Sequence, residues 1–164
     1  MVGVLVDTAF LITLADETKT RVNHETALAY WKYFRENRVP IYLSAIVVSE
    51  YEVEHPINEK VRSACVPLVF DLEAGALAAH FDKQREREPG VARQAVKDDL
   101  KIIAQAVSRD VAYVITDDHD TFAKYAERLR EAGQVRFAMV LLRDGFDVGY
   151  FRIGGQDLLT NQGI

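Results

Sequence analysis

The chain alternates short apolar runs, rich in β-branched residues, with longer segments in which apolar residues recur at helical spacing. The first pattern is typical of buried strands, and the second of helices that bury one face. The predicted strands are residues 2–6, 41–43, 66–70, 111–115 and 135–142. The predicted helices are residues 10–15, 24–36, 44–53, 58–64, 72–81, 95–107 and 122–132. Strands and helices that alternate through short connections predict an α/β fold, a three-layer sandwich with a mainly parallel central sheet flanked by helices.

Turn and cap residues refine these boundaries. Thr8 and Ser44 are predicted to cap the helices that follow the first two strands, and Gly133 to end the helix before it. Pro67 confines the third strand to the edge of the sheet or to a strand start, because proline has no N–H for a central ladder. No repeat or linker divides the chain, so residues 1–164 are predicted to form a single domain in which residues 144–164 are a C-terminal extension.

Acidic residues stand where several predicted strands end or the next helices begin: Asp7, Glu50, Asp99 and the pair Asp117–Asp118. The carboxyl ends of parallel strands share one edge, at which open α/β sheets bind ligands, so we expect these carboxylates to lie together. Each residue alone also fits a structural role as a helix cap or a partner of the helix dipole. Several carboxylates in one crevice repel each other unless a cation lies between them, and oxygen ligands suit Mg²⁺ or Mn²⁺. The joint placement therefore predicts a metal site that is suited to phosphate chemistry.

The composition restricts the possible ligands and the cellular location of the protein. The formal net charge of −5 is unlike that of a nonspecific nucleic-acid binder, although acids committed to metal lower the formal charge while bound ions cancel it locally. Cys65 is the only cysteine, which excludes an intramolecular disulfide and a thiolate zinc site and favours a cytoplasmic location. The apolar stretches are shorter than the roughly 20 residues that span a bilayer, so no membrane association is expected.

Four segments, in order, resemble the motifs of the PIN-domain nucleases. Residues 6–12 (VDTAFLI) are similar to the family's opening motif of a hydrophobic residue, Asp and Ser or Thr, and residues 44–50 (SAIVVSE) to its second motif, which ends in Glu. Residues 99–106 (DLKIIAQA) are similar to its Asp-x-x-Ile-x-Ala-x-Ala helix, and residues 115–118 (ITDD) with Phe122 to its final motif. The resemblance extends from Val4 to about Ala126.

The resemblance implies a metal-dependent endoribonuclease with a PIN fold. Asp7, Glu50, Asp99 and Asp118 would be its catalytic metal ligands, with Asp117 as an auxiliary ligand for Mg²⁺ or Mn²⁺. In such a site two divalent ions roughly 4 Å apart clamp the scissile phosphate of an RNA substrate. Small PIN proteins of this kind include VapC-type toxins, which an antitoxin protein holds inactive and which are commonly dimeric.

Four further residues are candidates for substrate contact. Thr8 and Thr116 carry hydroxyl groups next to the acidic positions, and Arg93 and Lys97 precede Asp99. Cations at the rim of an acidic crevice would attract a polyanion. The bases of this segment are interleaved with acids, so an ordinary solvated, salt-bridged helix face is the alternative interpretation.

The C-terminal extension contains more apolar residues than a solvated tail should carry: Phe146, Tyr150, Phe151, Ile153, Leu158 and Leu159. This excess predicts a homodimer, and packing of the tail on its own domain is the alternative.

Other functions fit less well. An Asp-nucleophile phosphatase normally has a second Asp two residues after the first, where this chain has Ala9. No glycine-rich turn follows the first strand, as a P-loop or a dinucleotide-binding fold would require. A PIN fold that has lost catalysis and serves as an RNA-binding or scaffold protein stays open, although all four acidic positions are filled.

Overall fold

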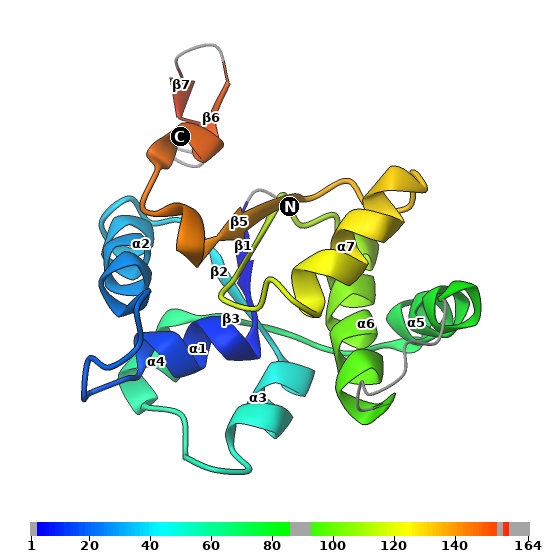
Figure 1. Cartoon of the computed structure of the whole chain (residues 1–164), viewed down its shortest axis with the longest axis horizontal. Helices are drawn as coiled ribbons and strands as arrows, with labels where there is room; N and C mark the ends of the chain where they lie inside the picture. The colour runs from blue at the N-terminus through cyan, green and yellow to red at the C-terminus, as the bar shows by residue number, and fades with distance from the viewer. Residues whose placement is uncertain (1–2, 86–92, 154–155, 158–164) are drawn as a thin grey trace.

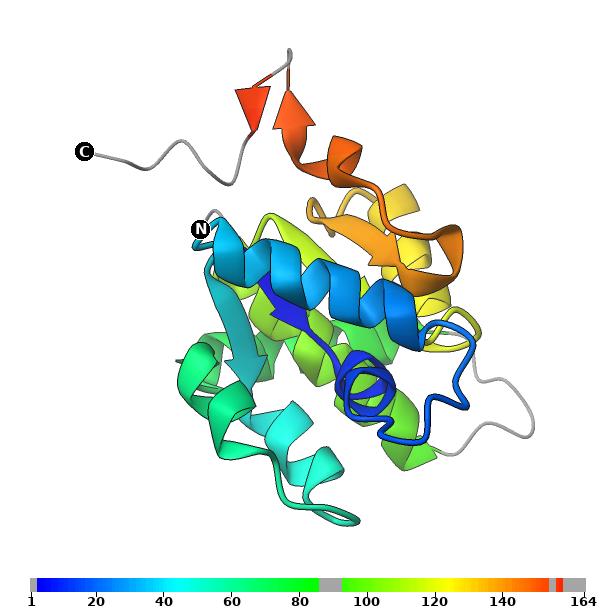
Figure 2. The same ribbon diagram turned by 90° about the vertical axis from the view of Figure 1, so that its left-hand side faces the viewer.

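The computed structural model describes residues 3–85, 93–153 and 156–157 (Figures 1 and 2). Its strands are β1 (Val4–Val6), β2 (Ile41–Ser44), β3 (Val66–Leu68), β4 (Tyr113–Thr116), β5 (Ala138–Leu141), β6 (Arg152–Ile153) and β7 (Gln156–Asp157). Its α-helices are α1 (Thr8–Leu14), α2 (His24–Glu36), α3 (Ala45–Tyr51), α4 (Glu59–Ala64), α5 (Leu72–Gln84), α6 (Arg93–Ser108) and α7 (Phe122–Glu131). Two short 3₁₀ helices, η1 (Leu142–Asp144) and η2 (Val148–Phe151), follow β5.

The central sheet has the strand order β3-β2-β1-β4-β5, and every neighbouring pair is parallel. The chain adds β2 and β3 on one side of β1 and then returns to add β4 and β5 on the other side. The strand order therefore reverses between β1 and β4, and such a switch point opens a crevice beyond the carboxyl ends of the two strands. Pro67 lies in the edge strand β3, as expected for a residue without an N–H.

Helices cover both faces of the sheet, which confirms the predicted three-layer α/β sandwich. Figure 1 shows α1 and α2 on one side and α6 and α7 on the other, with α5 packed outside α6. Helix α6 is buried on more than one face, since Leu100, Ile102, Ile103 and Ala106 are all at most 2% exposed. It lies between α5 and the sheet, and this packing fixes the direction in which its first turns point.

Some predicted boundaries were wrong. The cap of α1 is Asp7 and not Thr8, because the Asp7 carboxylate accepts the hydrogen bond from the N–H of Phe10. Ser44 caps α3 as predicted. Helix α7 ends at Glu131 with Ala132 as its cap, and Gly133 follows at φ +72°, a conformation that favours glycine.

The last strand of the sheet is shorter than the predicted range 135–142. Strand β5 begins at Ala138, which pairs with Tyr113, the first residue of β4, so the partner strand limits where the ladder starts. After Leu141 the buried Leu142 turns the chain into η1, which Gly145 ends at φ +84°.

The start of the C-terminal segment packs on its own domain. Phe151 is fully buried, and its ring lies 4.9 Å from that of Tyr113 and 5.6 Å from that of Phe34. Phe146 meets the ring of Tyr30 at 4.9 Å. Residues Leu158 and Leu159 lie outside the described residues, as does the side chain of Ile153. Of the two interpretations of the apolar tail, packing on its own domain is therefore correct for Phe146 and Phe151.

No helix in the described part of the chain is long and apolar enough to cross a membrane.

Candidate active site

Four carboxylates come from different elements to one end of the sheet. Asp7 follows β1, Glu50 lies in α3 after β2, Asp99 lies in the second turn of α6, and Asp118 follows β4. Asp7 and Asp118 thus lie on the two sides of the switch point between β1 and β4. Asp118, Asp7 and Glu50 each raise the pKa of Asp99, so the four groups form one electrostatic cluster.

Asp7 is the most buried member of the cluster. Its side chain is 3% exposed; Oδ1 accepts from the N–H of Phe10 at 2.7 Å, and Oδ2 accepts from the hydroxyl of Thr116. Loss of hydration raises its pKa to about 7 against the lowering effect of its two hydrogen bonds, and Asp118 and Glu50 add smaller contributions that raise it further. The fold therefore holds a carboxylate where water cannot stabilise its charge.

Asp99 is the member whose oxygens accept no hydrogen bond from the described part of the chain. Burial, and after it the four carboxylates of Asp118, Asp7, Glu50 and Asp98, raises its pKa to about 8. A carboxylate in such surroundings gains more than the others from a cation. A strongly perturbed pKa at a predicted site position favours a functional role.

Glu50 and Asp118 are held by hydroxyl groups. The hydroxyl of Thr8 donates to Glu50, whose pKa burial raises. The hydroxyl of Thr121 and its N–H both donate to Asp118. These bonds orient the two carboxylates without neutralising them.

The hydrogen bonds of Thr116 link two members of the cluster. Thr116 is fully buried, and its hydroxyl donates to Asp7 and accepts from the N–H of Asp118 at 2.8 Å. Thr116 has no exposed surface in this fold, and a direct substrate contact there stays a prediction. Its hydroxyl couples two acids on either side of the switch point, and Thr8 is partly exposed beside Glu50.

The structure places the other predicted site residues, Asp117, Lys97 and Arg93, in different surroundings. Asp117 accepts from the hydroxyl of Thr13 at 2.6 Å and from the amide of Asn23 at 2.5 Å, so it ties the end of β4 to α1 and to the start of α2. Its role as an auxiliary ligand stays a prediction. Lys97 is partly buried in α6, and the side chain of Arg93 lies outside the described residues.

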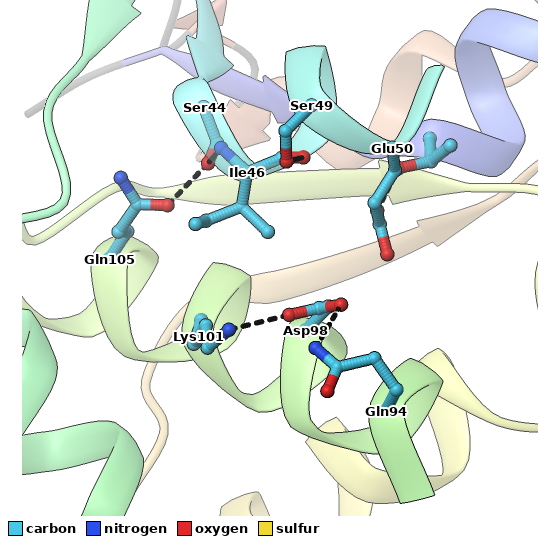
Figure 3. Close-up of polar contacts among 9 residues, drawn as sticks. Ser44, Ile46, Ser49, Glu50, Gln94, Asp98, Lys101 and Gln105 are labelled. Carbon is cyan, nitrogen blue, oxygen red and sulfur yellow. Dashed lines mark hydrogen bonds and ion pairs between the residues drawn. The ribbon is translucent and has the colours of Figure 1, made fainter. Parts of the chain in front are cut away.

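Sequence reasoning missed the ion pair that Asp98 makes beside the cluster. Figure 3 shows Asp98 between Lys101 and Gln94 on the face of α6 that lies opposite Glu50. Lys101 Nζ donates to Asp98 Oδ1 at 2.6 Å, and Gln94 Nε2 donates to Oδ2 at 2.8 Å. The i,i+3 spacing of Asp98 and Lys101 was the available signal. Both Asp98 oxygens are occupied, whereas Asp99 accepts no hydrogen bond from the described residues.

No family model and no curated protein matches the sequence. Solved structures match the fold. The structure of VapBC2 from Rickettsia felis bound to a promoter DNA fragment superposes with a TM-score of 0.58 at 13% identity, covering 85% of this chain and 99% of that one. VapC20 from Mycobacterium tuberculosis, a toxin that cleaves the sarcin–ricin loop, gives 0.53 at 15% identity over 74% and 95% of the two chains. DNA-bound VapBC from Salmonella typhimurium gives 0.51 at 18% identity over 85% and 98%.

The chain has the PIN-domain fold of VapC toxins. At these identities the likeness concerns the fold alone, and the four carboxylates are the independent observation at its site. In this PIN fold they lie at the carboxyl ends of β1 and β4 and on the two helices α3 and α6 that pack beside them.

The carboxylates of this PIN fold suit Mg²⁺ or Mn²⁺ by chemistry, though they do not form a closed cage. Among the described residues no three acidic, histidine or cysteine side chains converge in a geometry that would hold an ion. Mg²⁺ rarely uses such a cage, because it keeps several waters and takes one or two carboxylates together with substrate phosphates. An open cluster of desolvated oxygens around Asp7 and Asp99 has the donor chemistry that this ion takes, and metal binding stays a prediction.

The raised pKa values predict an unusual dependence of stability on pH. The folded protein keeps protons on Asp7 and Asp99 that the unfolded chain loses above its ordinary pKa of 3.8. Stability should therefore fall as the pH rises from about 4 through the folded pKa values of about 7 and about 8. In urea unfolding with EDTA, we expect the free energy of unfolding to be lower at pH 8 than at pH 5.5 by on the order of 5 kcal/mol for the two groups together. Equal or greater stability at pH 8 would show that these groups are not desolvated.

Proposed function

We propose that this protein is a metal-dependent endoribonuclease that hydrolyses RNA phosphodiester bonds with Mg²⁺ or Mn²⁺. The observation that carries the proposal is the pair of desolvated carboxylates, Asp7 after β1 and Asp99 on α6, in a fold shared with VapC toxins. One of those proteins is described as a toxin that cleaves the sarcin–ricin loop, which supports an RNA substrate here.

The roles of the residues follow from their surroundings. Asp7 and Asp99 have the highest charging cost, so they gain most from a divalent ion and would hold it together with Glu50 and Asp118. Thr116 holds Asp7 and Asp118 in place relative to each other through its two hydrogen bonds, and Thr8 orients Glu50. A bound divalent ion supplies an acidified water and neutralises charge that develops on the phosphate. No side-chain base with a tuned pKa is then required.

The direct test is cleavage of a panel of labelled RNAs by the purified full chain. We expect cleavage with Mn²⁺ or Mg²⁺ and none with EDTA. RNA binding without cleavage under every metal condition would instead favour a catalytically silent, RNA-binding PIN protein.

We also propose that the protein is the toxin of a toxin–antitoxin pair in the cytoplasm. Two of the structures that share its fold are VapBC complexes bound to DNA, which supports an antitoxin partner. Burial raises the pKa of the Cys65 thiol to about 11, so this cysteine stays protonated and unreactive. Co-expression with the product of a small adjacent gene should yield a complex in which RNA cleavage is suppressed.

The contribution of Arg93 and Lys97 to RNA binding remains a prediction. Replacing both by Ala should weaken RNA binding for all sequences and reduce its salt dependence, because each cation that contacts a phosphate releases counterions. Metal affinity should change little. An unchanged salt slope in a fluorescence-anisotropy titration would assign both residues to ordinary solvated surface.

The homodimer also remains a prediction. Part of the apolar tail that suggested it is used within the domain, but Phe146 keeps 46% of its surface exposed. Sedimentation at micromolar concentration should find a species of twice the chain mass, whereas a single 18.5 kDa species would exclude the dimer.

A further inference from the structure

Polar residues follow one face of α6 along the side of the acidic cluster. Gln94, Asp98, Lys101 and Gln105 are spaced three or four residues apart, so they share a face of the helix, and Figure 3 shows this face opposite α3. At one end Gln105 accepts from the hydroxyl of Ser44 and is fully buried. This bond anchors the face to the end of β2, so the residues before Gln105 have a fixed orientation toward Glu50.

The middle of this face carries the ion pair of Lys101 with Asp98. The Asp98 side chain is 15% exposed and the Lys101 side chain 31% exposed, so the pair is partly screened from water. Asp98 uses both oxygens, one for Lys101 and one for Gln94. An ammonium group has three N–H donors, and among the described residues only Asp98 receives one from Lys101. Lys101 therefore retains donors for another acceptor.

Lys101 also acts on the cluster itself. It lowers the pKa of Glu50, whereas Asp98 raises it, so both charges are felt across the gap between α6 and α3. Figure 3 shows the Glu50 side chain directed toward the Asp98 end of this gap. A polyanion that enters a crevice of four carboxylates meets repulsion, and a lysine at its wall offsets that repulsion at short range.

We propose that Lys101 binds an RNA phosphate next to the scissile one, and that Asp98 weakens this contact by pairing with the same ammonium group. This inference rests on the proposed function, because it takes RNA as the polyanion. It adds a residue that the sequence motifs do not mark and gives Asp98 a role opposite to that of its neighbour Asp99. Lys101 should therefore strengthen RNA binding and Asp98 should weaken it.

The test is a double-mutant cycle, read by fluorescence anisotropy with a single-stranded RNA in EDTA, so that no cleavage occurs. Lys101→Ala should weaken binding about fivefold and lower the salt slope by about 0.7, the value for one phosphate contact on a single strand. Lys101→Arg should largely retain binding. Asp98→Asn should tighten binding about threefold, and this gain should disappear in the Lys101→Ala background.

Matched controls separate a local effect from a change of net charge. Lys32→Ala removes a lysine that pairs with Glu36 on α2, and Asp120→Asn removes a carboxylate that is 86% exposed after β4. The proposal is wrong if Lys101→Ala behaves like Lys32→Ala, or if the gain from Asp98→Asn persists without Lys101. If the wild-type protein neither binds nor cleaves RNA, the proposed function itself fails. If it cleaves RNA and Lys101→Ala matches its control, only this inference fails.

Discussion

The Asp99→Asn protein is expected to lose Mn²⁺-dependent RNA cleavage by at least about 10²-fold while remaining folded. Asp99 receives no hydrogen bond from the described residues, so an amide at this position breaks no contact within the fold. Four carboxylates (Asp118, Asp7, Glu50 and Asp98) raise its pKa, and removing its charge relieves that repulsion. The variant should therefore be more stable than the wild type at pH 8 in EDTA, although it is inactive.

Asp120→Asn is the matched control, since it makes the same chemical change at an exposed carboxylate. Its cleavage rate and its stability should both stay close to those of the wild type. Wild-type cleavage by the Asp99→Asn protein would remove Asp99 from the site. An inactive but unfolded protein would instead show that Asp99 has a structural role that its surroundings do not suggest.

Phe151→Ala is expected to cost about 3–5 kcal/mol of folding free energy. Phe151 is fully buried between α2 and β4, where its ring contacts those of Tyr33, Phe34 and Tyr113. The cavity left by the missing ring cannot close around rigid aromatic neighbours. Urea unfolding monitored by circular dichroism measures the loss.

Phe146→Ala serves for comparison, because the same ring is removed from a position that is 46% exposed. Phe146→Ala should reduce the folding free energy clearly less than Phe151→Ala does. If both variants reduced the folding free energy by a similar, small amount, the segment after β5 would be an extension that the domain does not need for stability. A large effect at Phe151 alone means that the domain extends at least to η2, beyond the start of the extension predicted at residue 144.

The sequence predicted the features that depend on local pattern and residue type. The apolar run of β1 and the helical spacing of α6 follow from burial, and the acids after β1 and β4 follow from the edge at which parallel strands end. Their place at the switch point needed the strand order, because only that order makes β1 and β4 neighbours. No sequence pattern states which strands pair.

Contacts between segments that are far apart in the chain could not be predicted from the sequence. Thr116 looks like a free hydroxyl in the sequence, yet it is buried against Asp7, which lies 109 residues away. Asp117 looks like a free carboxylate in the sequence, yet Thr13 and Asn23 donate to its two oxygens. In each case the hydrogen-bond partner belongs to another element, and spacing along the chain does not indicate that partner.

Calorimetric titration of the metal-free protein with Mn²⁺ at pH 7 tests the central claim most directly. At this pH Asp99, with a pKa of about 8, is largely protonated, and Asp7, with a pKa of about 7, is partly protonated, so a bound ion must displace protons from both. Titrations in buffers of different ionisation enthalpy should therefore report binding with release of about one proton or more. Asp99→Asn should weaken the binding and reduce the proton release, while Asp120→Asn should change neither. Absence of Mn²⁺ binding, or binding that Asp99→Asn leaves unchanged, would contradict a metal site at these carboxylates.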